Sequence, residues 1–178
     1  GNDKVKPNVV TVTSVLNCWA KSRRPDAPAR TEAILERLKE SEELLRPNLV
    51  TYNVCLDAWA RSRHPNAPEK VEALFNELVQ SGLKPDVISY LSRISVWTRS
   101  RGRDSDVAPT RAAGVLEEML RSGDPESYPS APHYQAVLAC WSRYGNAVRA
   151  QDLLDRMLQD YFVGRKEKSA PGRYAFHL

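Results

Sequence analysis

The sequence contains little of what disulfide-stabilised, zinc-binding or membrane proteins require. Its three cysteines, Cys18, Cys55 and Cys140, are odd in number and widely spaced, so they cannot all pair as disulfides and lack the spacing of a zinc site. Each stands in an apolar helical pattern, so we expect buried small residues in a reducing compartment. No apolar run approaches the roughly 18 residues of a transmembrane helix, and no signal peptide is present.

Catalytic motifs are equally scarce. The three histidines, His64, His133 and His177, do not stand at metal-ligand spacing with a cysteine or a carboxylate. There is no glycine-rich phosphate loop, nucleophile elbow or paired-acid motif. We therefore expect no enzyme, no catalytic residue, no metal, no cofactor and no small-molecule substrate.

The composition is that of a folded chain with a slight basic excess. Of 178 residues, 42% are hydrophobic, which suffices for a buried core and argues against wholesale disorder. The formal charge of +4 arises from 26 basic and 22 acidic residues. An excess this mild only hints at an anionic partner, so the positions of the basic residues must decide.

Four tryptophans recur at nearly even spacing, each in the same local frame. They are 40, 38 and 44 residues apart, at Trp19, Trp59, Trp97 and Trp141. The frames are VVTVTSVLNCWAKS from Val9, LVTYNVCLDAWARS from Leu49, VISYLSRISVWTRS from Val87 and APHYQAVLACWSRY from Ala131. A period of this length indicates a repeat protein.

A second apolar pattern follows each frame. In the second repeat, Val71, Leu74, Phe75 and Leu78 have the i, i+3, i+4, i+7 spacing of one helix face. Prolines open three of these second helices and glycines close two of them, at Pro28, Pro68, Pro109, Gly82 and Gly123. Each repeat is thus predicted to be two antiparallel helices, A and B.

One such hairpin cannot bury its apolar face alone, so neighbouring hairpins must stack into a solenoid. The predicted helices span residues 9–23, 28–45, 49–63, 68–81, 87–101, 109–122, 131–144 and 147–160. The repeats are 9–48, 49–86, 87–130 and 131–170, and 171–178 begins a fifth. We expect each tryptophan to be mostly buried against its own helix B and the neighbouring repeat.

The junctions between repeats share a motif. The segments KPN, RPN and KPD run directly into VVTVT, LVTYN and VISY, and one second helix ends in EEM at Glu117–Met119. These features resemble the pentatricopeptide repeat family over nearly the whole chain. The resemblance implies an all-α fold, a right-handed α–α superhelix, that binds single-stranded RNA. The repeats are longer than the family's usual period, and the fourth has Ala-Pro-His where the family has two aliphatic residues and threonine.

Basic residues recur in phase with the tryptophans. Lys21, Arg61, Arg99 and Arg143 stand two residues after each one, and Arg23, Arg63 and Arg101 follow two residues later. Stacking would align the first set, here called the cation row, along the ends of the A helices. We expect both sets to bind the phosphates of a nucleic-acid strand. Cations at a helix C-terminus also complement the helix dipole without any ligand, and both roles stay open. The acidic residues concentrate on the B helices, which we expect to be a solvated face.

The resemblance also implies base-reading positions. In the family, a polar residue early in helix A and the last residue of the repeat read one base, and an aliphatic residue packs on it. The readers here are Thr13 with Asn48 for adenine and Asn53 with Asp86 for uracil; the packing residues are Val10, Val50, Ile88 and Pro132. Asn48, Asn53 and Asp86 also suit turns and helix caps. Leu91, paired with Ser130, cannot hydrogen-bond a base, and Gln135 with Ala170 is left unassigned.

Two functions remain open besides that of a purely structural spacer. The first is RNA binding in organellar RNA processing, stability or translation, in a mitochondrion or plastid, with a targeting sequence outside this chain. The second is a protein-binding scaffold within a large assembly such as an organellar ribosome. A continuous basic concave face would favour RNA, and an apolar or mixed groove would favour a peptide. Neither function involves a membrane.

Overall fold

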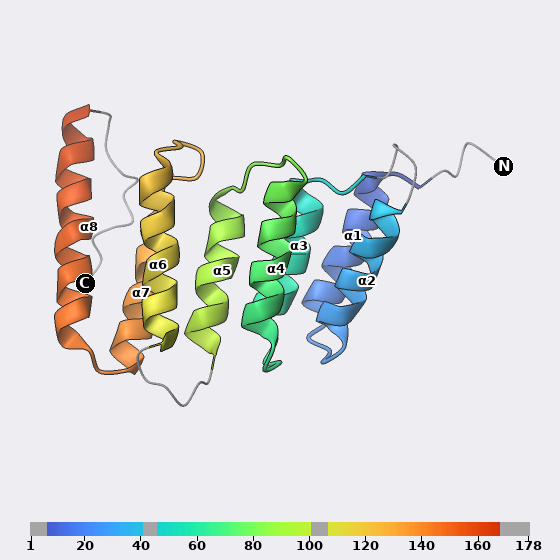
Figure 1. The fold of residues 1–178 in the computed structure, drawn as a ribbon, viewed down its shortest axis with the longest axis horizontal. Helices are drawn as coiled ribbons and strands as arrows, with labels where there is room; N and C mark the ends of the chain where they lie inside the picture. Colours follow the sequence, from blue (N-terminus) through green and yellow to red (C-terminus); the bar gives the residue numbers. More distant parts are fainter. Residues whose placement is uncertain (1–6, 41–45, 101–106, 168–178) are drawn as a thin grey trace.

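The chain folds into a row of helical hairpins (Figure 1). The computed structural model describes residues 7–40, 46–100 and 107–167. Within these ranges lie eight α-helices and no strand: α1 (Val9–Lys21), α2 (Ala27–Lys39), α3 (Leu49–Arg61), α4 (Ala67–Gln80), α5 (Val87–Arg99), α6 (Val107–Ser122), α7 (Ala131–Arg143) and α8 (Ala147–Glu167). The predicted all-α solenoid of helix–turn–helix repeats is confirmed. None of these helices is long and apolar enough to cross a membrane.

The helix limits agree with the predicted ones to within a few residues, except at the end of α2, which stops at Lys39 instead of near residue 45, and at the end of α8. That helix continues to Glu167 instead of ending near residue 160, because its one internal glycine, Gly164, does not break it and no proline intervenes. Parts of the predicted 28–45 and 87–101 helices, and the start of a fifth repeat at 171–178, lie outside the described residues.

The repeat junctions start the A helices. Asn8, Asn48, Asp86 and Ser130 are the N-caps, each in a reciprocal capping box with the residue three positions later. In α7 this residue is His133, which replaces the family's threonine: its Nδ1 accepts from the Ser130 N–H at 3.2 Å, so its Nε2–H donates to the Val87 carbonyl at 2.8 Å. The Ala-Pro-His departure therefore preserves the cap and adds a link to the preceding repeat.

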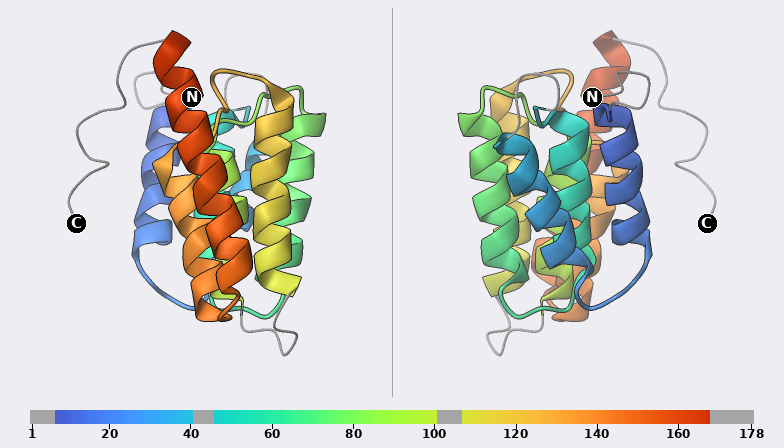
Figure 2. Two further views of the ribbon diagram at one scale, coloured as in Figure 1. Left: turned by 90° about the vertical axis from the view of Figure 1, so that its left-hand side faces the viewer. Right: turned by 90° about the vertical axis from the view of Figure 1, so that its right-hand side faces the viewer.

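The hairpins form two layers. Neighbouring A helices (α1, α3, α5 and α7) pack directly on one another, and each of the helices α2, α4 and α6 packs on its own A helix and on the next one. Seen end-on, α4 and α6 lie on one side of the molecule and α1 on the other (Figure 2). Because the A helices are the closely spaced set, the A layer forms the inner face of the solenoid.

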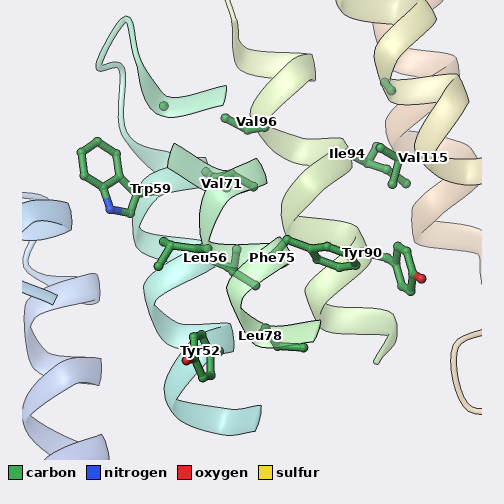
Figure 3. Close-up of a cluster of buried hydrophobic side chains, with 14 of the residues drawn as sticks. Tyr52, Leu56, Trp59, Val71, Phe75, Leu78, Tyr90, Ile94, Val96 and Val115 are labelled. Atoms are coloured by element: carbon green, nitrogen blue, oxygen red, sulfur yellow. The ribbon is translucent and has the colours of Figure 1, made fainter. Parts of the chain in front are cut away.

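The cores of successive repeats are continuous (Figure 3). Tyr52, Leu56 and Trp59 of α3 meet the apolar stripe of α4, and Phe75 of α4 contacts Tyr90 of the next repeat with ring centroids 5.1 Å apart. This is the inward-facing arrangement that the i, i+3, i+4, i+7 pattern predicts.

A second stripe on each A helix packs against the preceding repeat. In α3 it consists of Thr51, Cys55 and Ala58, all buried, and the Cys55 thiol lies 3.5 Å from the Thr31 carbonyl of α2. The same stripe in α1, which includes Val15 and Cys18, is exposed. The prediction that all three cysteines are buried is therefore wrong for Cys18, because no described helix covers this face of α1.

The tryptophans are less uniform than predicted. Trp59 and Trp141 are buried, whereas Trp19 and Trp97 are only half-buried. Trp59 is covered by His64 from the A–B turn, edge-on at 5.7 Å. Trp97 has no such ring contact among the described residues, and Trp19 carries Arg24 and Arg30 over its ring, at 5.9 and 5.7 Å. Long cationic side chains thus cover part of the ring and leave the rest accessible.

Ion pairs join neighbouring B helices. They are Lys39–Glu77 and Lys70–Glu32 between α2 and α4, Glu72–Arg93–Glu118 from α4 through α5 to α6, and Arg156–Glu117 between α8 and α6. All five of these glutamates are half-buried. The expectation of a purely solvated acidic face is therefore wrong, because these carboxylates bridge the wider gaps between B helices.

The Arg93 contact is the most enclosed of them. Arg93 is 8% exposed, donates to Glu72 and Glu118 at 2.9 Å each, and lies over the Phe75 ring at 4.1 Å. Burial by itself lowers the pKa of Arg93, but the hydrogen bonds to the two carboxylates raise it above its usual value. The guanidinium therefore stays charged and holds repeats 2 and 3 together.

Replacing Arg93 separates its charge from its packing. Arg93→Ala leaves two carboxylates without their partner and opens a void, and should lower the free energy of unfolding by about 2–4 kcal/mol, since both carboxylates are partly exposed. Arg93→Met fills similar volume but leaves the same two carboxylates unpaired, so it should also be destabilising, by less than Arg93→Ala. Urea titration followed by circular dichroism measures both, with the exposed Arg37→Ala as control. Equal losses in the two Arg93 variants would show that packing plays no part.

Candidate nucleic-acid interface

The inner face of each A helix carries side chains in a fixed order. If each frame is numbered from its first residue (Val9, Leu49, Val87 or Ala131), these side chains stand at positions 2, 5, 9 and 13. In α3 these are Val50, Asn53, Asp57 and Arg61, and in α5 they are Ile88, Leu91, Ser95 and Arg99. Both sets line one groove of about 540 Å³ between α3 and α5, together with Asn17 and Asp86. The structure thus brings into one groove the residues of repeats 2 and 3 that were predicted to pack on a base, to read it and to bind phosphate.

The aliphatic row lies at the start of the A helices. Val10, Val50 and Ile88 are 71%, 53% and 54% exposed, and Pro132 is exposed as well. Aliphatic side chains this open, aligned one per repeat, suit contact with flat apolar surfaces such as the faces of bases.

The second pair of predicted readers is assembled. Asn53 Nδ2 donates to both Asp86 carboxylate oxygens, at 3.0 and 3.1 Å, and the Ser89 hydroxyl donates to Asn53 Oδ1 at 2.6 Å. These contacts fix the orientation of the amide, which is 7% exposed. Asn53 and Asp86 both line the groove, so the groove presents this pair in a fixed orientation.

The Asp86 carboxylate also stabilises the start of α5. Its Oδ1 accepts the backbone N–H groups of Ile88 and Ser89, at 3.0 and 2.9 Å, and so caps α5. Asn48 likewise caps α3 by accepting from the Thr51 N–H at 3.0 Å. The capping roles are thus observed for both residues. Thr13, the predicted partner of Asn48, is half-buried on α1 and is not hydrogen-bonded to it.

The cation row is exposed, and three of its members have protein contacts. Arg61 Nε donates to Asp57 at 2.7 Å within α3. Arg99 donates to the Ala60 carbonyl at 3.2 Å, and Arg143 to the Thr98 carbonyl, each at the C-terminus of the preceding A helix. Both proposed roles of the row are thus compatible: these arginines satisfy helix-end carbonyls of the neighbouring repeat and keep other N–H groups for an anion.

Charge differs between the groove and the adjoining edge of the solenoid. In the groove, Arg61 and Arg99 are balanced by Asp57 and Asp86. Two clefts of about 930 and 990 Å³ flank the turn between α3 and α4, and no carboxylate is among the described residues that line them. Their basic residues are Lys21, Arg23, Arg24, Arg61, Arg63, Arg99 and Arg143. The basic excess therefore lies at the A–B turns. Arg101 lies outside the described residues.

The groove contains residues that sequence reasoning missed. Asn17, Asp57 and Ser95 occupy position 9 of their frames and line it beside the readers. Their spacing of four residues from Thr13, Asn53 and Leu91 was a usable signal, since residues four apart share a helix face.

The described residues offer little for catalysis or metal binding. No group of three or more histidine, cysteine or acidic side chains in the described ranges is arranged to hold a metal ion. Burial raises the pKa of the Cys55 thiol to about 12, so this thiol stays protonated and unreactive at neutral pH.

The fold and the groove together define an α-helical repeat solenoid whose inner face carries both aliphatic and polar side chains. Residues 1–61 match the family model of the pentatricopeptide repeat domain. The solved structure of the pentatricopeptide repeat protein PPR10 from maize is similar over 87% of this chain, with a TM-score of 0.65 and 19% identity. This chain covers 20% of the length of that one. No curated protein matches the sequence significantly. The family match covers the first 61 residues, and the structural similarity shows that the same kind of fold extends over most of the chain.

The Asp86 contacts predict a difference between two substitutions. Asp86→Ala removes the cap of α5 and the anchor of the Asn53 amide, and should destabilise the fold by about 1–2 kcal/mol. Asp86→Asn should cost much less, because asparagine caps α1 and α3 in the same frame. Thermal and urea unfolding of the two variants measure this, with Glu69→Ala as an exposed control. Similar losses in both would mean that the carboxylate charge, rather than the cap, is what stabilises α5.

Proposed function

We propose that the chain binds single-stranded RNA along its inner face, with bases over the aliphatic row and the readers and phosphates toward the cation row. The observation that carries the proposal is the groove between α3 and α5, where exposed aliphatics, an oriented amide and cations follow in order along both helices. Short amide side chains suit the Watson–Crick edges of bases, which are free only in single strands.

Both the family match and the fold support this proposal. The organellar setting, in a mitochondrion or plastid, and a role in RNA processing, stability or translation rest on the family resemblance alone. Crosslinking of the full-length protein to RNA in cells, followed by sequencing, would identify the transcripts.

The second candidate is a protein-binding scaffold, with other proteins of an organellar assembly as partners. It is favoured by the balanced charge of the groove and by Leu91, which places an aliphatic side chain where a reader is expected. The two candidates differ in how binding depends on salt and on the cation row.

If each member of the cation row neutralises one phosphate, log Kd for single-stranded RNA should vary with log salt with a slope of about 0.7 per contact, near 3 for the row. Replacing Lys21, Arg61, Arg99 and Arg143 by glutamine should lower affinity strongly and flatten this slope. Glutamine is preferred to glutamate, since a carboxylate beside the Ala60 and Thr98 carbonyls would also disturb the fold. The matched control removes four exposed cations of the B helices, Arg37, Arg111, Arg121 and Arg149. Unchanged RNA affinity in the row variant would favour the scaffold.

Base reading predicts a positional bias. The parent chain, used to select from a random single-stranded RNA pool, should enrich adenine next to uracil, through Thr13 with Asn48 and Asn53 with Asp86. By the family's pairing rules, Asn53→Thr should move one position from uracil toward guanine. Each mismatch should cost about 1–3 kcal/mol, in line with base-edge discrimination elsewhere. A pool without bias, or a bias that ignores the substitution, contradicts base reading but leaves backbone binding intact.

A further inference from the structure

The residues at position 9 form a polar row between the readers and the cation row. Asn17, Asp57 and Ser95 hold this position in α1, α3 and α5, and all three line the groove between α3 and α5. All three are half-buried. The corresponding residue of α7 is Ala139, so the row covers only the first three repeats.

Helix geometry sets the place of this row. Position 9 lies about 6 Å along the helix axis from the reader at position 5, and about 6 Å from the cation at position 13. In a nucleotide, the ribose lies between the base and the phosphate. A strand with its base at position 5 and its phosphate at position 13 must therefore place a ribose over position 9.

The side chains at position 9 suit a hydroxyl group. The Asp57 carboxylate is held by Arg61 Nε at 2.7 Å through Oδ1, and its side chain is 37% exposed. An ionised carboxylate has about four acceptor sites, so Asp57 can accept a further O–H donor. Asn17 and Ser95 each offer a donor and an acceptor, as a hydroxyl partner requires.

We propose that Asn17, Asp57 and Ser95 recognise the ribose 2′-hydroxyl and thereby select RNA over DNA. This inference rests on the proposed function, because it takes the path of the strand from it. The 2′-hydroxyl distinguishes RNA from DNA at any given site. A DNA strand on the same path lacks the hydroxyl and covers Asp57 without returning a hydrogen bond, which carries a desolvation penalty.

The simpler role of Asp57, to hold Arg61, does not account for the whole row. In α5, Arg99 follows Ser95 by four residues but donates a hydrogen bond to the Ala60 carbonyl of the preceding repeat. Yet position 9 is polar in all three helices that contribute to the groove. A common ligand accounts for this better than three separate intrahelical contacts.

The test compares three labelled single strands that have the same bases and differ only at the 2′ position of the sugar: RNA, DNA that contains deoxyuridine in place of thymidine, and 2′-O-methyl RNA. Binding of each to the full chain is measured by fluorescence anisotropy at one salt concentration. The parent chain should prefer RNA over DNA about tenfold, or about 1.4 kcal/mol. It should bind 2′-O-methyl RNA more weakly than RNA, because methylation removes the donor.

The variant Asn17→Ala/Asp57→Ala/Ser95→Ala should lose this preference. Removing Asp57 frees Arg61, so DNA affinity should rise while the ratio of RNA to DNA affinity falls toward one. The control variant removes exposed polar residues of B helices, Asn76, Gln80 and Asp152, and should keep the parent ratio. Circular dichroism confirms that both variants fold.

The outcomes separate this inference from the proposed function. If the parent binds RNA with positional base bias but binds DNA equally well, ribose recognition is wrong while RNA binding stands. A triple variant that keeps the parent ratio overturns it as well. If the parent binds none of the three strands, both proposals are wrong.

Discussion

The packing of each A helix against the preceding hairpin is the contact on which the other features of this structure depend. It is made by one stripe of the A helix, which includes Cys55 in α3, Arg93 in α5 and His133 in α7. These three side chains contact the preceding repeat by different means: a thiol near a carbonyl, an ion-pair bridge and an imidazole hydrogen bond. Because each described repeat after the first packs in this way, the A helices align and their remaining faces form one continuous inner surface.

On the inner surface, residues that line the groove also stabilise the fold. Asp86 caps α5 and orients the Asn53 amide, while Arg99 satisfies a carbonyl of the preceding A helix and lines the groove. Side chains held in place by the fold are pre-organised, which lowers the entropy that a ligand must remove on binding. The basic excess at the A–B turns adds attraction for a polyanion beyond the balanced charge of the groove.

Much of the fold was predictable because its signals are local and repeated. The apolar spacing of Val71, Leu74, Phe75 and Leu78 gave the buried face of α4, and the Pro-Asn and Pro-Asp junctions gave the starts of α1, α3 and α5. Exposure at the first repeat was not predictable in this way. Cys18 stands in the same frame as Ala58 and Cys140, yet only Cys18 is exposed, because burial depends on a neighbouring hairpin and not on the residue's own helix.

The sequence by itself determined the repeat, the positions of the α-helices and which residues lie on the same face of a helix. These features follow from periodicity and from capping chemistry within a few residues. Tertiary structure decided which of these residues contact one another across helices and repeats. It joined Asn53 to Asp86 across 33 residues and paired several acidic residues of the B helices with cations of other helices. The physical reason is that hydrogen bonds and ion pairs act over a few ångströms, so they depend on how closely and at what angle one hairpin stacks on the next.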